Sequence, residues 1–469
     1  MNTYRLSFKG SSDLLKYIEE QNVQFVDLNF TPLSGKWQRL TLHASAINKK
    51  AIENGVFTDN KGDGLQNILI KPDISRVSYD PFAAQKTIKI FCDLYAPDAG
   101  KPHLLATRSV ARRAQAYLKE SGVGDNVFYG SDIQFFVFDS VKVINTPNQI
   151  GYHLDSEEGA YNKARDYPTG NMGHRPDIGS GLLSEGPVDS LSDIRAEMLS
   201  VIESMGVAVD LHHHGAAAGQ CVLGLRADTL LSAADNIQIC KHVAHNVAHS
   251  YGKSATFMPR PLNDGSGSAM HIKQSLWNNG RPLFSGNEYA NLSDTAMYYI
   301  GGILKHIRAL NAFGNPTTNS YKRLNATGAP ILPAYSQRND ASACYIPPAQ
   351  SADERRINLY FPDPAANPYL LFSATLMAGL DGVKNKIHPG SAIDDDPALS
   401  EEDKSALSSR MCTSLDAALD DLQADHAFLL QGHVFTKELI DAYVLLKKKE
   451  VKTFESMTHP IEIDMYYSS

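Results

Sequence analysis

The sequence lacks long apolar runs, closely spaced cysteines and an excess of positive charge. No uninterrupted apolar run reaches the roughly 20 residues that a membrane-spanning helix needs, and the first residues show no signal-peptide pattern. The five cysteines are scattered without metal-type spacing, which suits a reducing cytoplasm. The net charge of -8 argues against a nucleic-acid or anionic-membrane partner. We therefore expect a cytoplasmic protein without either partner.

The length and the local patterns predict two domains of the α+β class. A chain of 469 residues is too long for one small core. Residues 1–104 combine a short amphipathic helix with strand-like segments at 24–30 and 87–93. Residues 105–469 alternate strand-like segments with helical patterns, at about 109–118, 189–205, 229–251, 293–312 and 368–381. We expect a small mixed domain followed by a larger α/β domain.

Several segments carry a distinctive order of residues. They are Asn315-Pro-Thr-Thr-Asn-Ser-Tyr-Lys-Arg323, Phe361-Pro-Asp-Pro-Ala-Ala-Asn-Pro-Tyr369, His242-Val-Ala-His-Asn-Val-Ala-His249 and Lys253-Ser-Ala-Thr-Phe-Met-Pro259. Together they resemble signature segments of bacterial type I glutamine synthetase, and the resemblance covers nearly the whole chain. It implies a β-grasp N-terminal domain, a larger catalytic domain and a dodecamer of two stacked hexameric rings. It also implies that ammonia is joined to glutamate using ATP, through a γ-glutamyl phosphate, with two Mg²⁺ or Mn²⁺ ions.

The metal-binding positions implied by this resemblance hold mostly neutral side chains. The Gly-Pro-Glu-x-Glu-Phe-Phe pattern corresponds to residues 130–136, where strand alternation aims Asp132 and Gln134 at one face. The other ligand positions correspond to Gly215, Val222, His271 and Asn358. Mg²⁺ needs anionic oxygens, and two divalent ions ~6 Å apart repel by roughly 11 kcal/mol at an effective dielectric constant of ~20. We therefore expect the two-metal site and the ATP site to be lost, and no cofactor.

The groups expected to hold substrate and phosphate are altered as well. Arg323 matches the arginine that binds the substrate carboxylate. Lys273 replaces a histidine near the phosphates, where it could bind an anion or neutralise Asp132 or Asp340. Arg356 and Ser275 match positions near the nucleotide but are too few to carry its binding. The phosphate-facing arginines and the acidic flap residue correspond to Asp340, Tyr345, Tyr360 and Gly328.

A second group of residues could form a different metal site. His212, His213, His214 and Cys221 match or neighbour former site positions, with His271 and Asp132 in the same region. Imidazole and thiolate ligands suit Zn²⁺ or copper. Strand alternation, however, splits the triplet, so that His212 and His214 face one side and His213 the other. The alternative is that the histidines are inherited from the family and Cys221 is a small buried thiol.

These observations leave three hypotheses. The first, which we expect, is a catalytically inactive pseudoenzyme that keeps the ring assembly and binds a true synthetase, another protein or a metabolite. The second is a repurposed enzyme that holds an amino-acid-like substrate at Arg323 with an altered metal site. The third is a purely structural role, such as filament or mixed-ring formation.

Overall fold

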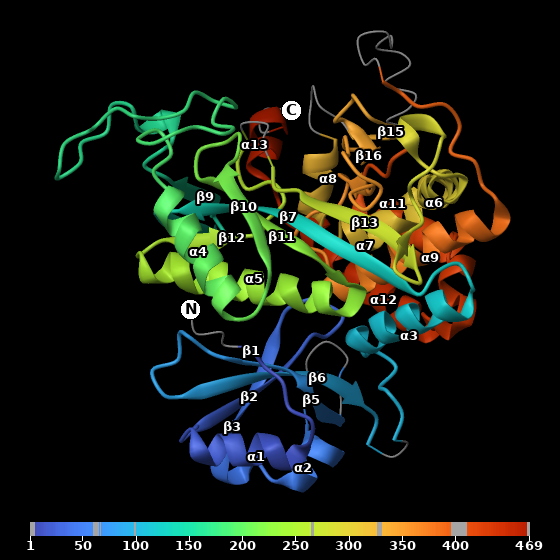
Figure 1. Cartoon of the computed structure of the whole chain (residues 1–469). Coiled ribbons are helices and arrows are strands. Elements are labelled where there is room, and N and C mark those ends of the chain that lie inside the picture. Colours follow the sequence, from blue (N-terminus) through green and yellow to red (C-terminus); the bar gives the residue numbers. More distant parts are fainter. Residues whose placement is uncertain are drawn as a thin grey trace.

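The computed structural model describes residues 5–59, 65, 67–97, 100–263, 267–325, 331–394 and 410–466. The small N-terminal domain lies below the larger domain in Figure 1. Both contain a sheet and helices, so the predicted α+β class is confirmed. Among the described residues, no helix is long and apolar enough to cross a membrane.

The N-terminal domain is a mixed six-stranded sheet with helices on one side. Its strand order is β1-β5-β6-β2-β3, with β4 paired to β5, and β2 runs parallel to β6. Alternating apolar residues of the central strands, such as Val26 and Leu28 of β2, are fully buried in its core. The elements are β1 (Arg5–Leu6), α1 (Ser11–Glu20), β2 (Phe25–Phe30), β3 (Gln38–His43), η1 (Ala44–Ala46), α2 (Lys49–Asn54), β4 (Val56–Thr58), β5 (Ile68–Tyr79) and β6 (Thr87–Tyr95).

The larger domain is built on a nine-stranded sheet in the order β10-β11-β7-β13-β17-β16-β15. The long strand β7 lies near its middle and also pairs with β12, while β14 pairs with β13. The strands are β7 (Asn126–Phe138), β10 (Val209–His214), β11 (Gln220–Thr229), β12 (Ser254–Thr256), β13 (Met270–Asn278), β14 (Arg281–Pro282), β15 (Leu332–Ser336), β16 (Ser342–Tyr345) and β17 (Ile357–Leu359).

Helices cover this sheet, and α5 lies between it and the N-terminal domain (Figure 1). Helix α9 is apolar on nearly all sides, which suits a helix enclosed by others. The helices are α3 (Thr107–Glu120), η2 (Ala160–Asn162), α4 (Ser192–Ser204), α5 (Leu230–Ser250), η3 (Tyr289–Asn291), α6 (Asp294–Lys305), α7 (Ile307–Gly314), α8 (Thr318–Leu324), α9 (Pro368–Asn385), α11 (Leu415–Ala424), η5 (Ala427–His433), α12 (Lys437–Glu455) and α13 (Pro460–Tyr466).

Helices α6 and α9 approach each other at glycines. A Cβ on Gly302 would lie 2.1 Å from the carbonyl oxygen of Ala378, and one on Gly382 would lie 2.0 Å from that of Tyr298. A Cβ on Gly379 would lie 2.1 Å from the ring of Tyr299. The two helix backbones therefore meet at a distance that only glycine permits.

Two helices differ from the sequence prediction. The single helix expected at 293–312 is two, because the chain breaks at His306, whose ring contacts Asp381 and Asp425. The helix expected to open at Asp189 begins at Ser192, because the Asp189 carboxylate accepts the Leu191 backbone N–H.

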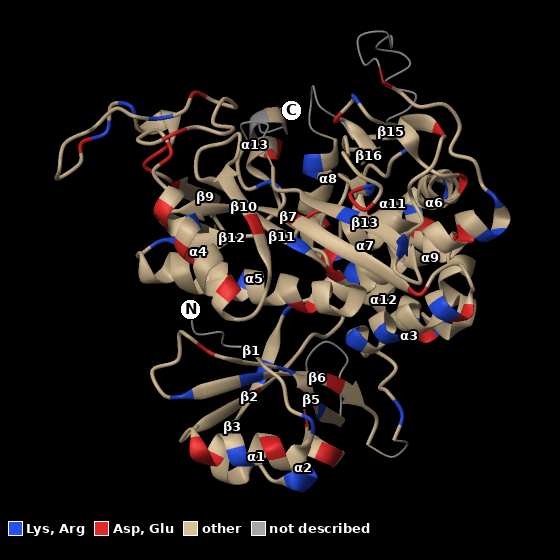
Figure 2. Cartoon of the chain, in the orientation of Figure 1, with Lys and Arg blue, Asp and Glu red and all other residues tan. Residues whose placement is uncertain are grey.

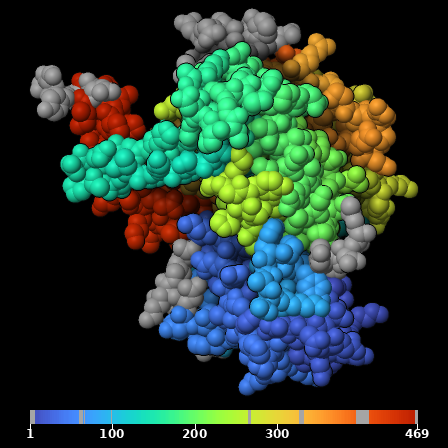
Figure 3. All heavy atoms as spheres, turned by 90° about the vertical axis from the view of Figure 1, so that its left-hand side faces the viewer, coloured from blue at the N-terminus to red at the C-terminus, as the bar shows by residue number. Residues whose placement is uncertain are grey.

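The hairpin formed by β8 (Ser140–Thr146) and β9 (Gln149–Asp155) pairs with neither main sheet. Figure 3 shows it as a teal projection from the body of the molecule. Its apolar residues face outward, and Val143 is 73% exposed. This strand pair therefore presents an uncovered apolar face in the single chain.

Arginines of α3 connect the two domains. Arg108 donates hydrogen bonds to Asp73 of β5, Asp93 of β6 and Asp235 of α5, at 2.8 to 3.1 Å. Arg112 lies 2.6 Å from Asp73 and 3.0 Å from Asp93. Basic residues recur along α3 in Figure 2. We propose that the domain boundary lies between residues 104 and 105, just before this helix.

Candidate functional site

The predicted metal positions Asp132, Gln134, Val222 and His271 lie on adjacent strands of the larger sheet. Asp132 of β7 is directly opposite His271 of β13, and Gln134 is opposite Val222 of β11. Asp132 and Gln134 are partly exposed while Ile133 is fully buried, so the two polar side chains share one face. The sequence alternation therefore placed these residues correctly relative to one another.

Asp132 is paired with a cation. The Lys273 ammonium lies 2.7 Å from its Oδ1 and 3.8 Å from Oδ2 of Asp210 on β10. Of the two roles considered for Lys273, the structure places it beside Asp132. Asp210 was not among the residues singled out from the sequence.

The side-chain amides of Gln134 and Gln220 lie next to each other on this face of the sheet. Gln134 Oε1 accepts the Ala269 N–H at 2.9 Å and lies 3.4 Å from the amide nitrogen of Gln220. The same Gln220 nitrogen also donates to the Gly267 carbonyl. A Cβ on Gly215 would lie 2.5 Å from the Gln220 side chain. Glycine at position 215 therefore leaves the room that Gln220 occupies.

Aromatic rings lie where the resemblance implies phosphate-facing arginines. Tyr360 stacks between His271 (4.1 Å between ring centroids) and Tyr345 (5.3 Å). Desolvation, with Arg323 and Lys273 nearby, lowers the pKa of His271 to about 3. His271 is therefore a neutral imidazole near pH 7.

The remaining predicted residues of this region lie at its edges. Arg323 donates to the Phe361 carbonyl and, at 3.2 Å, to the Pro362 carbonyl, while its Nε has no hydrogen-bond partner among the described residues. Asn358 of β17 is buried opposite Lys273, and Ser275 lies on β13 and accepts from the Trp277 indole. Asp340 is exposed, and its charge contributes to the raised pKa of Tyr360. The guanidinium Nε of Arg356 has no hydrogen-bond partner among the described residues. Gly328 falls outside the described residues.

The predicted histidine and cysteine site does not form as a group. Cys221 is buried beside Arg195, and burial raises the pKa of its thiol to about 12. His213 contacts the His214 backbone carbonyl, and His212 Nδ1 has no partner among the described residues. Of the predicted transition-metal residues, only His214 joins a cluster of ligand-type side chains.

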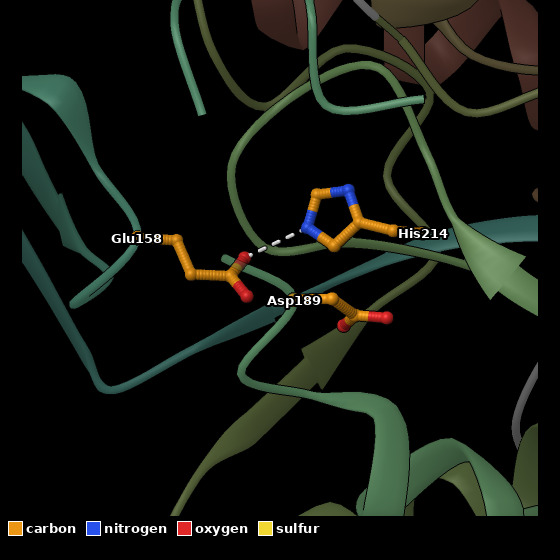
Figure 4. Close-up of side chains that lie close together, drawn as sticks. All are labelled: Glu158, Asp189 and His214. Atoms are coloured by element: carbon orange, nitrogen blue, oxygen red, sulfur yellow. Dashed lines mark hydrogen bonds and ion pairs between the residues drawn. The ribbon is translucent and has the colours of Figure 1, made fainter. Parts of the chain in front are cut away.

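That cluster consists of Glu158, Asp189 and His214, all buried, with ligand atoms within 4.8 Å of one another. Figure 4 shows the three side chains converging from the segment after β9, the segment before α4 and the end of β10. His214 Nε2 lies 3.0 Å from Glu158 Oε2. Sequence analysis missed Glu158 and noted Asp189 only as a helix start.

Fixed donors hold this cluster in place. Glu158 accepts hydrogen bonds from the Gly219 N–H and from the N–H and hydroxyl of Ser190, at 2.7 to 2.9 Å. Burial would raise the pKa of Glu158, but His214 and these donors lower it below its ordinary value. Asp189 is fixed by two contacts with the buried Arg195. The Glu158 carboxylate is therefore ionised near pH 7.

The donor chemistry of the cluster fits one divalent cation. Two carboxylates and one imidazole are ligands that Mn²⁺ and Zn²⁺ take, and Mg²⁺ takes the carboxylates. Coordination would replace the hydrogen bond between His214 and Glu158. The expectation of no cofactor is therefore wrong, because it considered only the positions on the central strands.

Comparison with known proteins gives matches over both domains. Residues 22–97 match the family model for the glutamine synthetase β-Grasp domain, and residues 104–466 match that for the glutamine synthetase catalytic domain. The glutamine synthetase of Azospirillum brasilense is 48% identical over 464 residues, covering 97% of this chain and 99% of the relative. That of Rhizobium meliloti is 46% identical over 465 residues, covering 98% and 99%. A cryo-electron microscopy structure of Plasmodium falciparum glutamine synthetase shares the fold, with a TM-score of 0.89, 24% identity and 100% coverage of both chains.

These matches contradict the pseudoenzyme hypothesis and the expectation that the chain is not an enzyme. The hypothesis rested on a small set of site positions, whereas almost half of all positions are identical to proteins named glutamine synthetase. The cation-type cluster points the same way. The prediction of a β-grasp domain followed by a catalytic-type domain is confirmed.

Proposed function

This chain belongs to the glutamine synthetase family, and on that premise we propose that it is an ATP-dependent carbon–nitrogen ligase with a divergent active site. It joins ammonia to the side-chain carboxylate of glutamate. The observation that carries the proposal is the 48% identity over 97% of the chain to a glutamine synthetase. Such identity across both domains supports retention of the reaction together with the fold.

The proposal assigns the cation to Glu158, Asp189 and His214. Their two carboxylates and one imidazole supply the ligand atoms. A bound Mg²⁺ or Mn²⁺ neutralises charge on a transferring phosphoryl group. Ser190 and Gly219 orient the Glu158 carboxylate, and Arg195 orients that of Asp189, so the donors stay in place.

Arg323 is the proposed contact for the substrate carboxylate. Its Nη2 is held by two backbone carbonyls, which fixes the plane of the guanidinium and leaves Nε as a further donor. Arg356 and Ser275 are the proposed nucleotide contacts.

The site is divergent, in this proposal, at Gln134, Gly215, Val222, Gly328, Asp340, Tyr345, Asn358 and Tyr360. Asp132, paired with Lys273, and His271, stacked on Tyr360, are the remaining ligand-type side chains of that set. Ligation must therefore proceed with Asp132 as the one carboxylate at these metal positions of the central strands. This requirement makes a direct assay of glutamine formation decisive.

The test is glutamine formation by protein purified from a host that lacks its own glutamine synthetase. ¹⁵N-labelled ammonia, glutamate and ATP are supplied with Mg²⁺ or Mn²⁺, and labelled glutamine is measured by mass spectrometry. We expect ATP-dependent labelled glutamine, with loss of about 10- to 100-fold in Glu158→Gln, since removal of an orienting or ligating group has effects of that size. The neighbouring exposed Glu157→Gln is the matched control. No labelled glutamine from the wild-type protein would refute the proposal.

The same variants test the cation assignment. We expect wild-type protein equilibrated with Mn²⁺ and gel-filtered to retain the metal, and Glu158→Gln to lose most of it. Equal manganese content in the two proteins would exclude the Glu158 cluster as the cation site.

We further propose a cytoplasmic homo-oligomer, a dodecamer of two hexameric rings. The exposed apolar hairpin β8–β9 and the exposed Ile461 and Ile463 of α13 support contacts between copies of the chain. Native mass spectrometry gives the subunit number, and a mixed mass would identify a second synthetase in the ring.

A further inference from the structure

A large open cavity lies away from the candidate site, between the two domains. Its volume is about 990 Å³. The loop at 34–38 of the N-terminal domain forms one wall, and α5, α12 and the segment at 257–259 form the others. None of the predicted site residues and none of the Glu158 cluster lines it. The cavity therefore belongs to neither the central strands nor the cation-type cluster.

The cavity has an excess of positive side chains. Lys36, Lys241 and Lys447 line it, and Glu450 is the acidic residue among its lining. Glu450 is already paired with Lys447, at 2.9 and 3.1 Å. Among the described residues, no carboxylate lies within 4.0 Å of the Lys241 ammonium, which is 3.5 Å from the Ala366 carbonyl. Lys241 is therefore a partly enclosed cation that no carboxylate of the described residues contacts directly.

Aromatic rings stand beside this cation. The Lys241 ammonium lies 5.8 Å from the centroid of the Phe257 ring, which His245 contacts edge-on at 5.2 Å. On the other wall, Trp37 contacts His242 edge-on at 5.5 Å. Burial lowers the pKa of both histidines, so near pH 7 they present neutral rings. The cavity thus combines aromatic lining with the positive charge of Lys241 beside Phe257.

Burial also affects Lys241 itself. It lowers the pKa of the Lys241 ammonium to about 8, against the opposing charge of Asp363. A carboxylate placed next to the ammonium would offset this cost, because an adjacent opposite charge favours the ionised form.

We propose that this cavity binds an organic carboxylate with a planar ring, its carboxylate on Lys241 and its ring against the aromatic side chains of the lining, Phe257 and Trp37 among them. A charge-assisted hydrogen bond anchors the acid group, and burial of the ring supplies the rest of the affinity. The site is an addition to the ligase chemistry and does not depend on it.

The probe is 2-naphthoate, with 2-naphthamide as its uncharged analogue, titrated by calorimetry into the full-length protein. We expect 2-naphthoate to bind and the amide to bind at least about tenfold more weakly, as loss of a charge-assisted hydrogen bond predicts. Lys241→Met, which keeps the length of the side chain, is expected to lose the preference for the acid. Lys384→Met, at an exposed lysine of α9, is the control and is expected to keep it.

A second measurement on the wild-type protein does not depend on how the variant folds. Acetic anhydride acetylates lysine amines, releasing acetate and a proton, and mass spectrometry gives the rate at Lys241. We expect 2-naphthoate, but not 2-naphthamide, to slow acetylation of Lys241 and to leave that of Lys384 unchanged. Equal binding of acid and amide, no binding of the acid at millimolar concentration, or binding without protection of Lys241 would each overturn the proposal.

Discussion

Single residues decide what the central strands of the larger domain can hold. One local arrangement is centred on Gln220. Its side-chain amide occupies the space beside Gly215 and hydrogen-bonds to Gln134 and to the Gly267 carbonyl. Lys273 and Asp132 form a second one. Both are local side-chain contacts within the nine-stranded sheet and its adjoining loops.

We predict that Gly215→Glu destabilises the protein by about 1–3 kcal/mol, the range for overpacking a filled site. Its Cβ would lie 2.5 Å from Gln220, whose amide is held by hydrogen bonds. Urea unfolding measures the change. Gly151→Glu on the exposed hairpin, where no atom lies within 4 Å of the added Cβ, is the control. Equal stability of the two variants would show that Gln220 moves aside freely.

The ion pair at Asp132 gives a second prediction at this scale. Lys273→Met leaves a partly buried carboxylate with little compensation and is expected to cost about 1–3 kcal/mol of unfolding free energy. The double variant Lys273→Met, Asp132→Asn should recover most of the loss, because the unpaired charge is gone. A double-mutant cycle in urea measures the coupling, and additive losses would argue against a direct pair.

At the scale of elements, α3 ties the two domains through charge. Arg108 and Arg112 reach β5, β6 and α5 at once. The helix itself followed from its sequence pattern, but these partners are more than a dozen residues away along the chain. Only the folded topology brings them together.

The α3 network predicts how stability depends on pH. Burial would raise the pKa of Asp73, but Arg108, Ser75 and Arg112 outweigh this and hold it well below its ordinary value. The unfolded value is about 3.9, so the contribution of Asp73 is fully present above about pH 5 and is lost as the pH falls below 4. We expect Asp73→Asn to lower the unfolding free energy at pH 7 and to flatten its fall between pH 5 and pH 3. Asp166→Asn, at an exposed residue, is the control, and parallel pH curves for Asp73→Asn and wild type would contradict the assignment.

At the scale of the whole molecule, the fold was more predictable than the site. The segments around Arg323 and Tyr369 identified the family, and alternation placed Asp132 and Gln134 on one face. The Glu158 cluster was not predicted, because its members lie in irregular segments and at a strand end, where periodicity carries no information. The pseudoenzyme hypothesis was wrong because it gave a few site positions more weight than the sequence identity to glutamine synthetases over nearly the whole chain.

The assembly gives the prediction for the whole molecule. In the proposed dodecamer, Val141→Glu with Val143→Glu places charges on the exposed hairpin and should separate the two rings, lowering the mass measured by light scattering by about half. Lys142→Gln on the same strand is the control. It changes a charge on the hairpin but leaves Val141 and Val143 in place, so the mass should stay unchanged. An unaltered mass in the double variant would place the contact between rings elsewhere.

The glycine contacts between α6 and α9 restrict which residues can occupy those positions. A methyl group at Gly302 or Gly382 would clash with the backbone of the other helix, and no change of side-chain rotamer could relieve this clash. Substitutions there are therefore expected to give temperature-sensitive protein whatever ligand the molecule binds. The contact between α6 and α9 therefore limits which residues positions 302 and 382 can hold, independently of the chemistry at the central strands.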